Sequence, residues 1–182
     1  MSMIAVIDTE TNWSDRVMSI GTVIAREDTL EAVEGHYRVL APEYTVGGMY
    51  DGALCLEAPE TVVCSRQEAI GFLLERLRLY GVTKLFAYNA CFDRNHLPEL
   101  RSYGWYDIMR LAAYRQTNPA IPQWADCCST GRLKRGYGVE PMLRLLSGQT
   151  SYQETHNALD DAKDELQIMR LLSHRVRDYP PL

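Results

Sequence analysis

The chain begins with a pattern that is typical of a sheet built around a buried strand. Residues 3–7 read Met-Ile-Ala-Val-Ile, a continuous apolar run, which predicts a strand covered on both faces and therefore central in its sheet. Residues 16–25 and 30–40 predict two more strands, joined near residues 27–28 as a hairpin. Strands so close in the sequence are expected to be antiparallel.

Helical patterns dominate the rest of the chain. Ser65 and Glu68 have the spacing of a capping box, and apolar residues at helical spacing then predict a helix to about residue 80. A strand is expected over residues 83–88. Further helices are expected over residues 92–103, 107–116, 139–146 and 156–177.

Two long segments lack such a pattern. Residues 41–64 and 117–138 contain several Pro and Gly residues, so we expect loops there, with at most a short strand in the first. Early strands followed by alternating helices and strands predict an α/β fold, a mixed sheet with helices on its faces. The length of 182 residues is that of one domain, spanning residues 1–182.

Composition excludes several classes of protein. Hydrophobic residues make up 46 % and charged residues 24 %, as in ordinary globular domains. No apolar run approaches the roughly 20 residues that cross a bilayer, and the start lacks a basic, apolar leader, so we expect neither a membrane partner nor a secretory signal. The five cysteines include no C-x-x-C pair, which predicts free thiols and a cytoplasmic location.

The formal net charge of −5 argues against a protein that holds nucleic acid by bulk positive charge. The same charge is compatible with a protein that binds phosphates through bound divalent cations. The positions of the acidic residues decide between these two hypotheses.

Asp8 and Glu10 follow the first apolar run at a spacing of two. Strand side chains alternate, so both carboxylates should project from the same face of the central strand. Like charges this close raise each other's pKa unless a cation lies between them. The alternative is a strand that ends early and leaves both acids in solvent.

Acids recur after a second strand and in the last helix. Asp93 lies at the start of a helix, where the helix dipole alone would also favour it. In the last helix, Asp161 falls at the edge of the apolar face and Asp160 nearly opposite, which makes Asp161 the candidate ligand. His156, at the helix start, is either a catalytic imidazole or an ordinary surface histidine.

Three local sequences, in this order, resemble the motifs of the DEDD-type exonuclease family, in the histidine-containing branch of proofreading exonucleases, oligoribonuclease and RNase T. They are Asp8-Thr9-Glu10, Asn89-Ala90-Cys91-Phe92-Asp93 and His156-Asn157-Ala158-Leu159-Asp160-Asp161-Ala162. The resemblance covers nearly the whole chain. It implies a ribonuclease H-like fold.

The resemblance further implies a metal-dependent 3′–5′ exonuclease that releases 5′-mononucleotides from single-stranded DNA or short RNA. Two Mg²⁺ or Mn²⁺ ions would stabilise charge on the attacking and leaving oxygens. By the same resemblance, Asp8 bridges the ions, Glu10 and Asp161 hold one of them, and Asp93 acts directly or through water. His156 would be the general base.

Six further residues are candidates for substrate binding. Trp13 stands where many relatives have a glycine, and it either stacks on a terminal base or plugs the core. Thr11 and Asn89 are carried over from the motifs. Arg132, Lys134 and Arg135 form a compact basic cluster, which either follows a phosphate backbone or is an ordinary charged loop.

Two other functions compete with the exonuclease hypothesis. One is a catalytically idle nucleic-acid-binding or scaffold protein on the same fold, and the other is a hydrolase of small phosphate esters. The expected partners are 3′ ends of single-stranded DNA or RNA. The resemblance also raises a second copy of the chain, or a polymerase or repair protein, as a partner.

Overall fold

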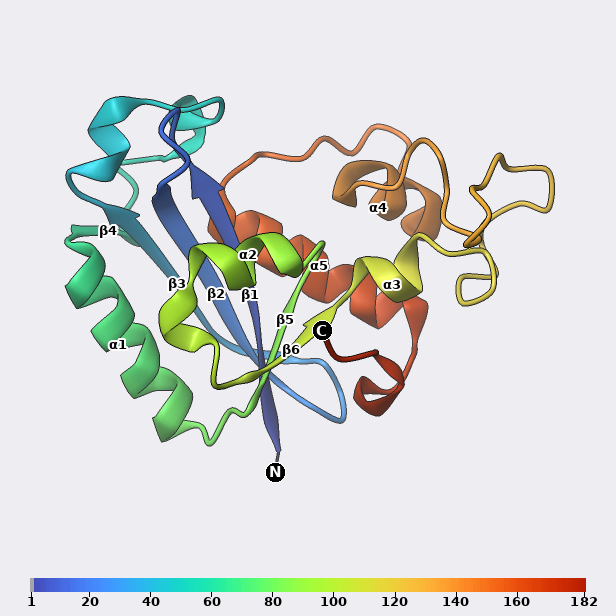
Figure 1. Cartoon of the computed structure of the whole chain (residues 1–182), viewed down its shortest axis with the longest axis horizontal. Coiled ribbons are helices and arrows are strands. Elements are labelled where there is room, and N and C mark those ends of the chain that lie inside the picture. The colour runs from blue at the N-terminus through green and yellow to red at the C-terminus, as the bar shows by residue number, and fades with distance from the viewer. Residues whose placement is uncertain (1) are drawn as a thin grey trace.

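The computed structural model describes residues 2–182. Within them, six strands form one mixed sheet in the order β4-β3-β2-β1-β5-β6 (Figure 1). β1 pairs antiparallel with β2 and parallel with β5, so the predicted central strand is confirmed. The strands are β1 (Met3–Thr11), β2 (Val17–Arg26), β3 (Ala32–Leu40), β4 (Thr61–Cys64), β5 (Lys84–Ala87) and β6 (Gly104–Asp107).

Helices cover both faces of this sheet. The capping box is confirmed, since the Ser65 hydroxyl accepts a hydrogen bond from the Glu68 backbone and the Glu68 carboxylate accepts one from the Ser65 backbone. The α-helices are α1 (Arg66–Leu79), α2 (Cys91–His96), α3 (Met109–Ala112), α4 (Val139–Ser147) and α5 (Ala158–Leu172). Short 3₁₀ helices span Glu43–Val46, Asp51–Ala53, Pro98–Leu100 and Val176–Asp178.

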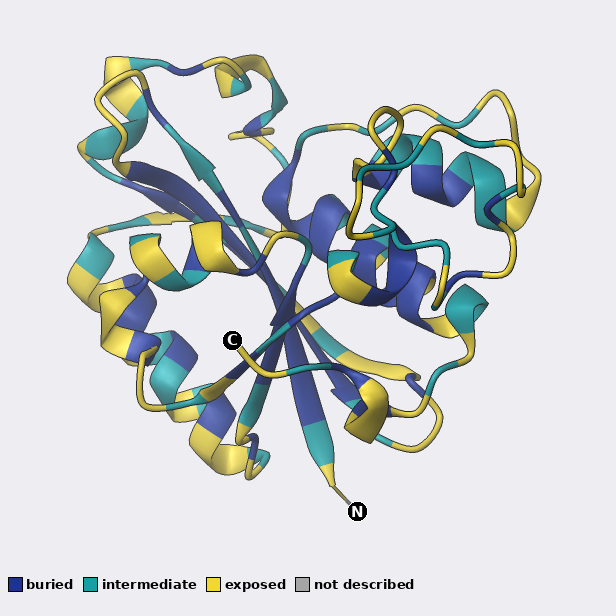
Figure 2. Ribbon diagram, turned by 45° about the vertical axis from the view of Figure 1, so that its right-hand side comes forward, coloured by how far each residue is buried: buried dark blue, intermediate teal, exposed yellow. Residues whose placement is uncertain are grey.

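The alternation of side chains along β1 divides the core into two layers. Ile4 and Val6 join a buried cluster with α3, α4 and α5, whereas Ala5 and Ile7 join a second cluster with α1. In Figure 2 the residues in the middle of the sheet are coloured as buried. Because the period of a strand is two, the acids that continue the Ile4 and Val6 series face α5.

Three of the predicted helices are wrong in extent. The helix expected over residues 92–103 ends at His96, because Pro98 interrupts its hydrogen bonding, and the chain continues into β6, which the pattern missed. The helix expected over residues 107–116 shrinks to Met109–Ala112. The last helix spans Ala158–Leu172 and ends at Ser173, whose φ is 56°, rather than running over residues 156–177.

The segment between β3 and α1 is more ordered than the sequence predicts. It contains two 3₁₀ helices and β4, which pairs parallel with β3. All five cysteines are free. Among residues 2–182, no helix combines the length and the apolar character that crossing a membrane requires.

Candidate active site

The acid pair lies at the carboxyl end of β1 and is part of the strand. Asp8 pairs with Gly21 and Glu10 with Ser19 on β2, so backbone pairing continues through both acids. The alternative of a strand that ends before them is wrong. Both side chains are half-buried on the face that packs against α5.

α5 brings Asp161 to this pair. Asn157 caps the helix by accepting hydrogen bonds from Leu159 and Asp160, and Asp161 then lies buried in the first turn. Asp160 points to solvent and pairs with Lys163 at 2.7 Å. The structure therefore places these two acids as the helical geometry predicts, with Asp161 inward.

Three predicted site residues meet in one cluster. Glu10, His156 and Asp161 each offer one ligand atom, and these atoms lie within 4.8 Å of one another. Asp8 Oδ2 and Asp161 Oδ1 are buried and accept no hydrogen bond within the described chain. Oxygen donors without partners, beside an imidazole nitrogen, suit a divalent cation, so the residues present fit the implied metal.

Asp93 reaches the same region from the other face of the sheet. After β5, Asn89 adopts a φ of 62° and the chain turns into α2. Asp107 fixes this turn, since its carboxylate accepts hydrogen bonds from the backbones of Asn89 and Met109, both at 3.0 Å. Asp93 is buried and accepts a hydrogen bond of 2.8 Å from the Thr9 hydroxyl.

Burial and mutual repulsion keep these acids from ionising together. Burial, followed by the charges of Asp93 and Asp161, raises the pKa of Asp8 well above its ordinary value. Burial and the charge of Glu154 raise the pKa of Glu10 and that of Asp161 to about 8 each. Burial raises the pKa of Asp93 to about 7 despite its hydrogen bond from Thr9. Bound cations would remove this conflict.

Two further acids belong to this region and were not predicted. Glu165 is 1 % exposed, and its Oε2 has no hydrogen-bond partner within the described chain. Burial and the charges of Asp8 and Asp93 raise the pKa of Glu165. A signal existed, because an acid one turn after Asp161 falls within the apolar face of the helix.

Glu154 is the second such acid. It lies in the irregular segment before α5 and its charge acts on Glu10 and Asp161. Burial raises the pKa of Glu154 as well. No periodicity marks a residue in such a segment, so the sequence offered no signal for it.

The candidate substrate residues are exposed or half-buried. Trp13 is 69 % exposed, so the alternative of a core plug is wrong. Thr11 ends β1, and Asn89 is exposed. Their roles in substrate binding stay predictions.

The basic segment, residues 131–137, is held beside the end of β5. The Tyr88 hydroxyl donates a hydrogen bond to the Tyr137 carbonyl. Arg132 stacks over the Tyr137 ring at 4.6 Å, and Lys134 pairs with Asp126 at 3.0 Å. The role of Arg132, Lys134 and Arg135 in binding phosphates stays a prediction.

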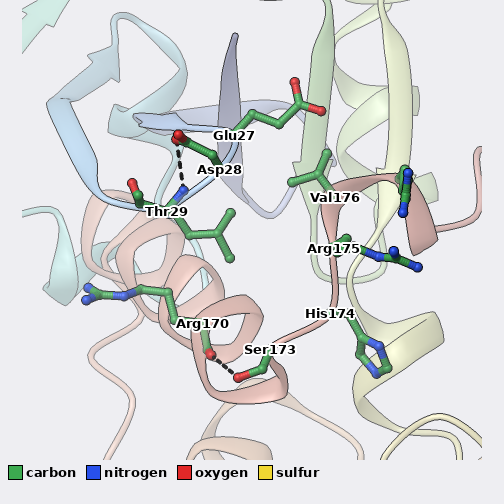
Figure 3. Close-up of a pocket in the computed structure, with 10 residues that line it drawn as sticks. Glu27, Asp28, Thr29, Arg170, Ser173, His174, Arg175 and Val176 are labelled. Carbon is green, nitrogen blue, oxygen red and sulfur yellow. Dashed lines mark hydrogen bonds between the residues drawn. The ribbon is translucent and has the colours of Figure 1, made fainter. Parts of the chain in front are cut away.

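A cavity of about 610 Å³ lies at the opposite end of the sheet (Figure 3). The β2–β3 hairpin contributes Asp28 and Thr29, and the end of α5 and the residues after it contribute Arg170, Ser173 and His174. None of the predicted site residues lines it. The acidic cluster is therefore separate from this cavity.

The chain has the ribonuclease H-like fold of the DEDD-type 3′–5′ exonucleases. The nuclease domain of 3'hExo, a DEDDh family member bound to rAMP, superposes with a TM-score of 0.65 at 14 % identity, over 100 % of this chain and 96 % of that one. A 3′-exonuclease whose structure concerns 3′-end-specific recognition of the histone mRNA stem-loop superposes with a TM-score of 0.67 at 14 % identity, over 99 % of this chain and 85 % of that one.

A longer enzyme shows the same likeness. E. coli Exonuclease I in complex with a dA16 oligonucleotide superposes with a TM-score of 0.61 at 14 % identity, over 98 % of this chain and 42 % of that chain. No protein-family model matches the chain, and neither does any curated protein. At these identities the likeness establishes the fold, and the activity has to be argued from the site.

Proposed function

We propose that this protein is a metal-dependent 3′–5′ exonuclease that releases 5′-mononucleotides from single-stranded DNA or short RNA. One observation carries the proposal. On an exonuclease fold, ligand atoms of Glu10, His156 and Asp161 come within 4.8 Å of one another, and Oδ2 of the neighbouring Asp8 is buried without a hydrogen-bond partner. Such a set of donors has no structural use in a core, because buried carboxylates without partners are costly.

The acidic side chains would hold two Mg²⁺ or Mn²⁺ ions. Asp8 would bridge them, Glu10 and Asp161 would hold one, and Asp93 would contribute directly or through water. When bound, such ions stabilise the charge that develops on the attacking and leaving oxygens of a phosphodiester.

The remaining chemistry falls to His156 and the surrounding surface. The His156 imidazole would accept the proton of the attacking water, since imidazoles exchange protons near neutral pH. The exposed Trp13 ring supports stacking on the terminal base, and Thr11 and Asn89 would also contact the substrate. Arg132, Lys134 and Arg135 would approach the phosphate backbone.

Degradation of end-labelled oligonucleotides tests the proposal. Matched DNA and RNA strands of several lengths are incubated with Mg²⁺ or Mn²⁺, with and without chelator, using Asp161→Asn as the control. Metal-dependent release of 5′-mononucleotides from the 3′ end supports the proposal. Strand binding without cleavage would instead indicate an idle binding protein, and cleavage of simple phosphate esters alone a small-substrate hydrolase.

A further inference from the structure

Tyr50 makes the direct ring contact to His156. The two rings stack with their centroids 3.9 Å apart and an angle of 17° between their planes. Tyr50 precedes the 3₁₀ helix Asp51–Ala53, in the segment between β3 and α1. Neither the sequence motifs nor the proposed function uses this segment.

The backbone at His156 does not by itself restrict the orientation of the imidazole. His156 has a φ of 56° and lies in an irregular stretch before α5. No helix or strand fixes the imidazole there. A side chain in that setting retains rotamer freedom unless something packs against it.

A second contact ties the same two segments together. The Asn157 side chain donates a hydrogen bond of 2.9 Å to the Ala53 carbonyl. Residues 50–53 therefore hold the start of α5 at two adjacent points, the ring of His156 and the cap residue Asn157.

Tyr50 also lies close to the acids of the cluster. Burial, followed by the charges of Glu10, Glu154 and Asp161, raises the pKa of Tyr50. The imidazole nitrogen of His156 lies within 4.8 Å of Glu10 and Asp161 at the same place. The Tyr50 ring thus packs on the imidazole at the place where the imidazole meets the ligand atoms of the cluster.

We propose that Tyr50 is a positioning residue, whose ring holds the His156 imidazole beside Glu10 and Asp161 for its action on the attacking water. The proposal rests on the proposed exonuclease function. The ring, and not the hydroxyl, carries the effect, because stacking needs only the aromatic face.

Two variants of the full chain separate the ring from the hydroxyl. Tyr50→Phe keeps the stack, and Tyr50→Ala removes it. With a single-stranded oligonucleotide and Mn²⁺, we expect Tyr50→Ala to lower kcat about 10- to 100-fold. Misplacing a catalytic group by about 1 Å can lower the rate about 100-fold. We expect KM and Mn²⁺ affinity to stay within about two-fold, and Tyr50→Phe to keep wild-type kcat.

Met49→Ala is the matched control, because Met49 precedes Tyr50 and is 68 % exposed. We expect it to leave kcat unchanged. A Tyr50→Phe variant as slow as Tyr50→Ala would overturn the proposal, and so would a Tyr50→Ala variant that changes KM instead of kcat.

A spectroscopic measurement separates this proposal from the exonuclease activity itself. A stacked aromatic ring shifts the imidazole C–H resonances of His156 upfield. We expect the shift in wild type and Tyr50→Phe and its loss in Tyr50→Ala. If the wild-type protein shows this pattern but has no nuclease activity, only the proposed exonuclease function is contradicted. If the His156 resonances are identical in all three proteins, the role of Tyr50 is contradicted.

Discussion

Gly21 on β2 and Ala158 at the start of α5 are in direct backbone contact. A Cβ added to Gly21 would lie 2.0 Å from the Ala158 carbonyl oxygen, far closer than atoms can approach. Gly21 is also the residue paired with Asp8 across β1 and β2. The absence of a side chain at Gly21 therefore sets the distance between the acid pair and the first turn of α5, which carries Asp161.

Gly21→Ala should destabilise the protein and weaken its metal site. The added methyl group has to displace backbone, so we expect a loss of about 1–3 kcal/mol in the free energy of unfolding. Because the displaced helix carries Asp161, Mn²⁺ should raise the melting temperature less than in wild type. Thermal unfolding with and without Mn²⁺ measures both effects.

Gly71→Ala is the control for this substitution. Gly71 lies in α1 with nothing within 4 Å of an added Cβ, so the change should stabilise the protein by about 0.5–1 kcal/mol. Equal melting temperatures for the two variants would show that the close contact at Gly21 does not constrain α5.

Asp161→Asn and Asp160→Asn test which neighbouring acid serves the site. Asp161 is 3 % exposed, whereas Asp160 pairs with Lys163 at the surface. We expect Asp161→Asn to abolish nuclease turnover without unfolding the protein and Asp160→Asn to retain it. The reverse order of activities would show that the cluster is not the catalytic site.

His156→Ala tests the role of the imidazole. If His156 accepts the proton of the attacking water, kcat should fall by about 10²–10⁴ while Mn²⁺ affinity changes little. Steady-state kinetics and calorimetric titration measure the two quantities. A large loss of Mn²⁺ affinity would make His156 a metal ligand instead, which its distance to Glu10 and Asp161 also allows.

The stability of the metal-free protein should fall as pH rises from about 4 to about 8. Burial and repulsion raise the pKa of Glu10 and of Asp161 to about 8, and burial raises that of Asp93 to about 7 in the folded state. Over this range the folded protein retains protons that the unfolded chain has released. Each such carboxyl costs about 1.4 kcal/mol of stability per pH unit.

Melting curves in chelator across this pH range check the prediction. Glu165→Gln should flatten the dependence, because burial raises the pKa of the Glu165 carboxyl as well. Saturating Mn²⁺ should reverse the slope, since the metal binds the deprotonated acids. A metal-free stability that rises with pH would contradict the raised pKa values.

The sequence predicts the central position of β1 and the convergence of the distant acids. The apolar run before Asp8 predicts that this acid lies on the central strand, and the helical spacing predicts that Asp161 faces the sheet. The structure shows Asp8 within β1 and Asp161 buried. The sequence does not predict β6, because Gly104–Asp107 is too short to show a period and is held by its pairing with β5.

Contacts between distant segments explain the parts of the site that the sequence did not reveal. Glu154 and Tyr50 lie in irregular segments, where no periodicity assigns a face. Their positions beside Glu10 and His156 depend on how α5 packs and on the Asn157–Ala53 hydrogen bond. Glu165 was predictable, since its place on the apolar face of α5 is a matter of helical geometry alone.

The number of Mn²⁺ ions bound in the presence of a 5′-mononucleotide shows whether the converging acids form a two-metal site. We expect saturable binding of two ions per chain in wild type and loss of that binding in Asp8→Asn, with Gly71→Ala unchanged. Wild-type protein that binds no Mn²⁺ saturably, or Asp8→Asn protein that binds it as wild type does, would show that these acids do not form a metal site.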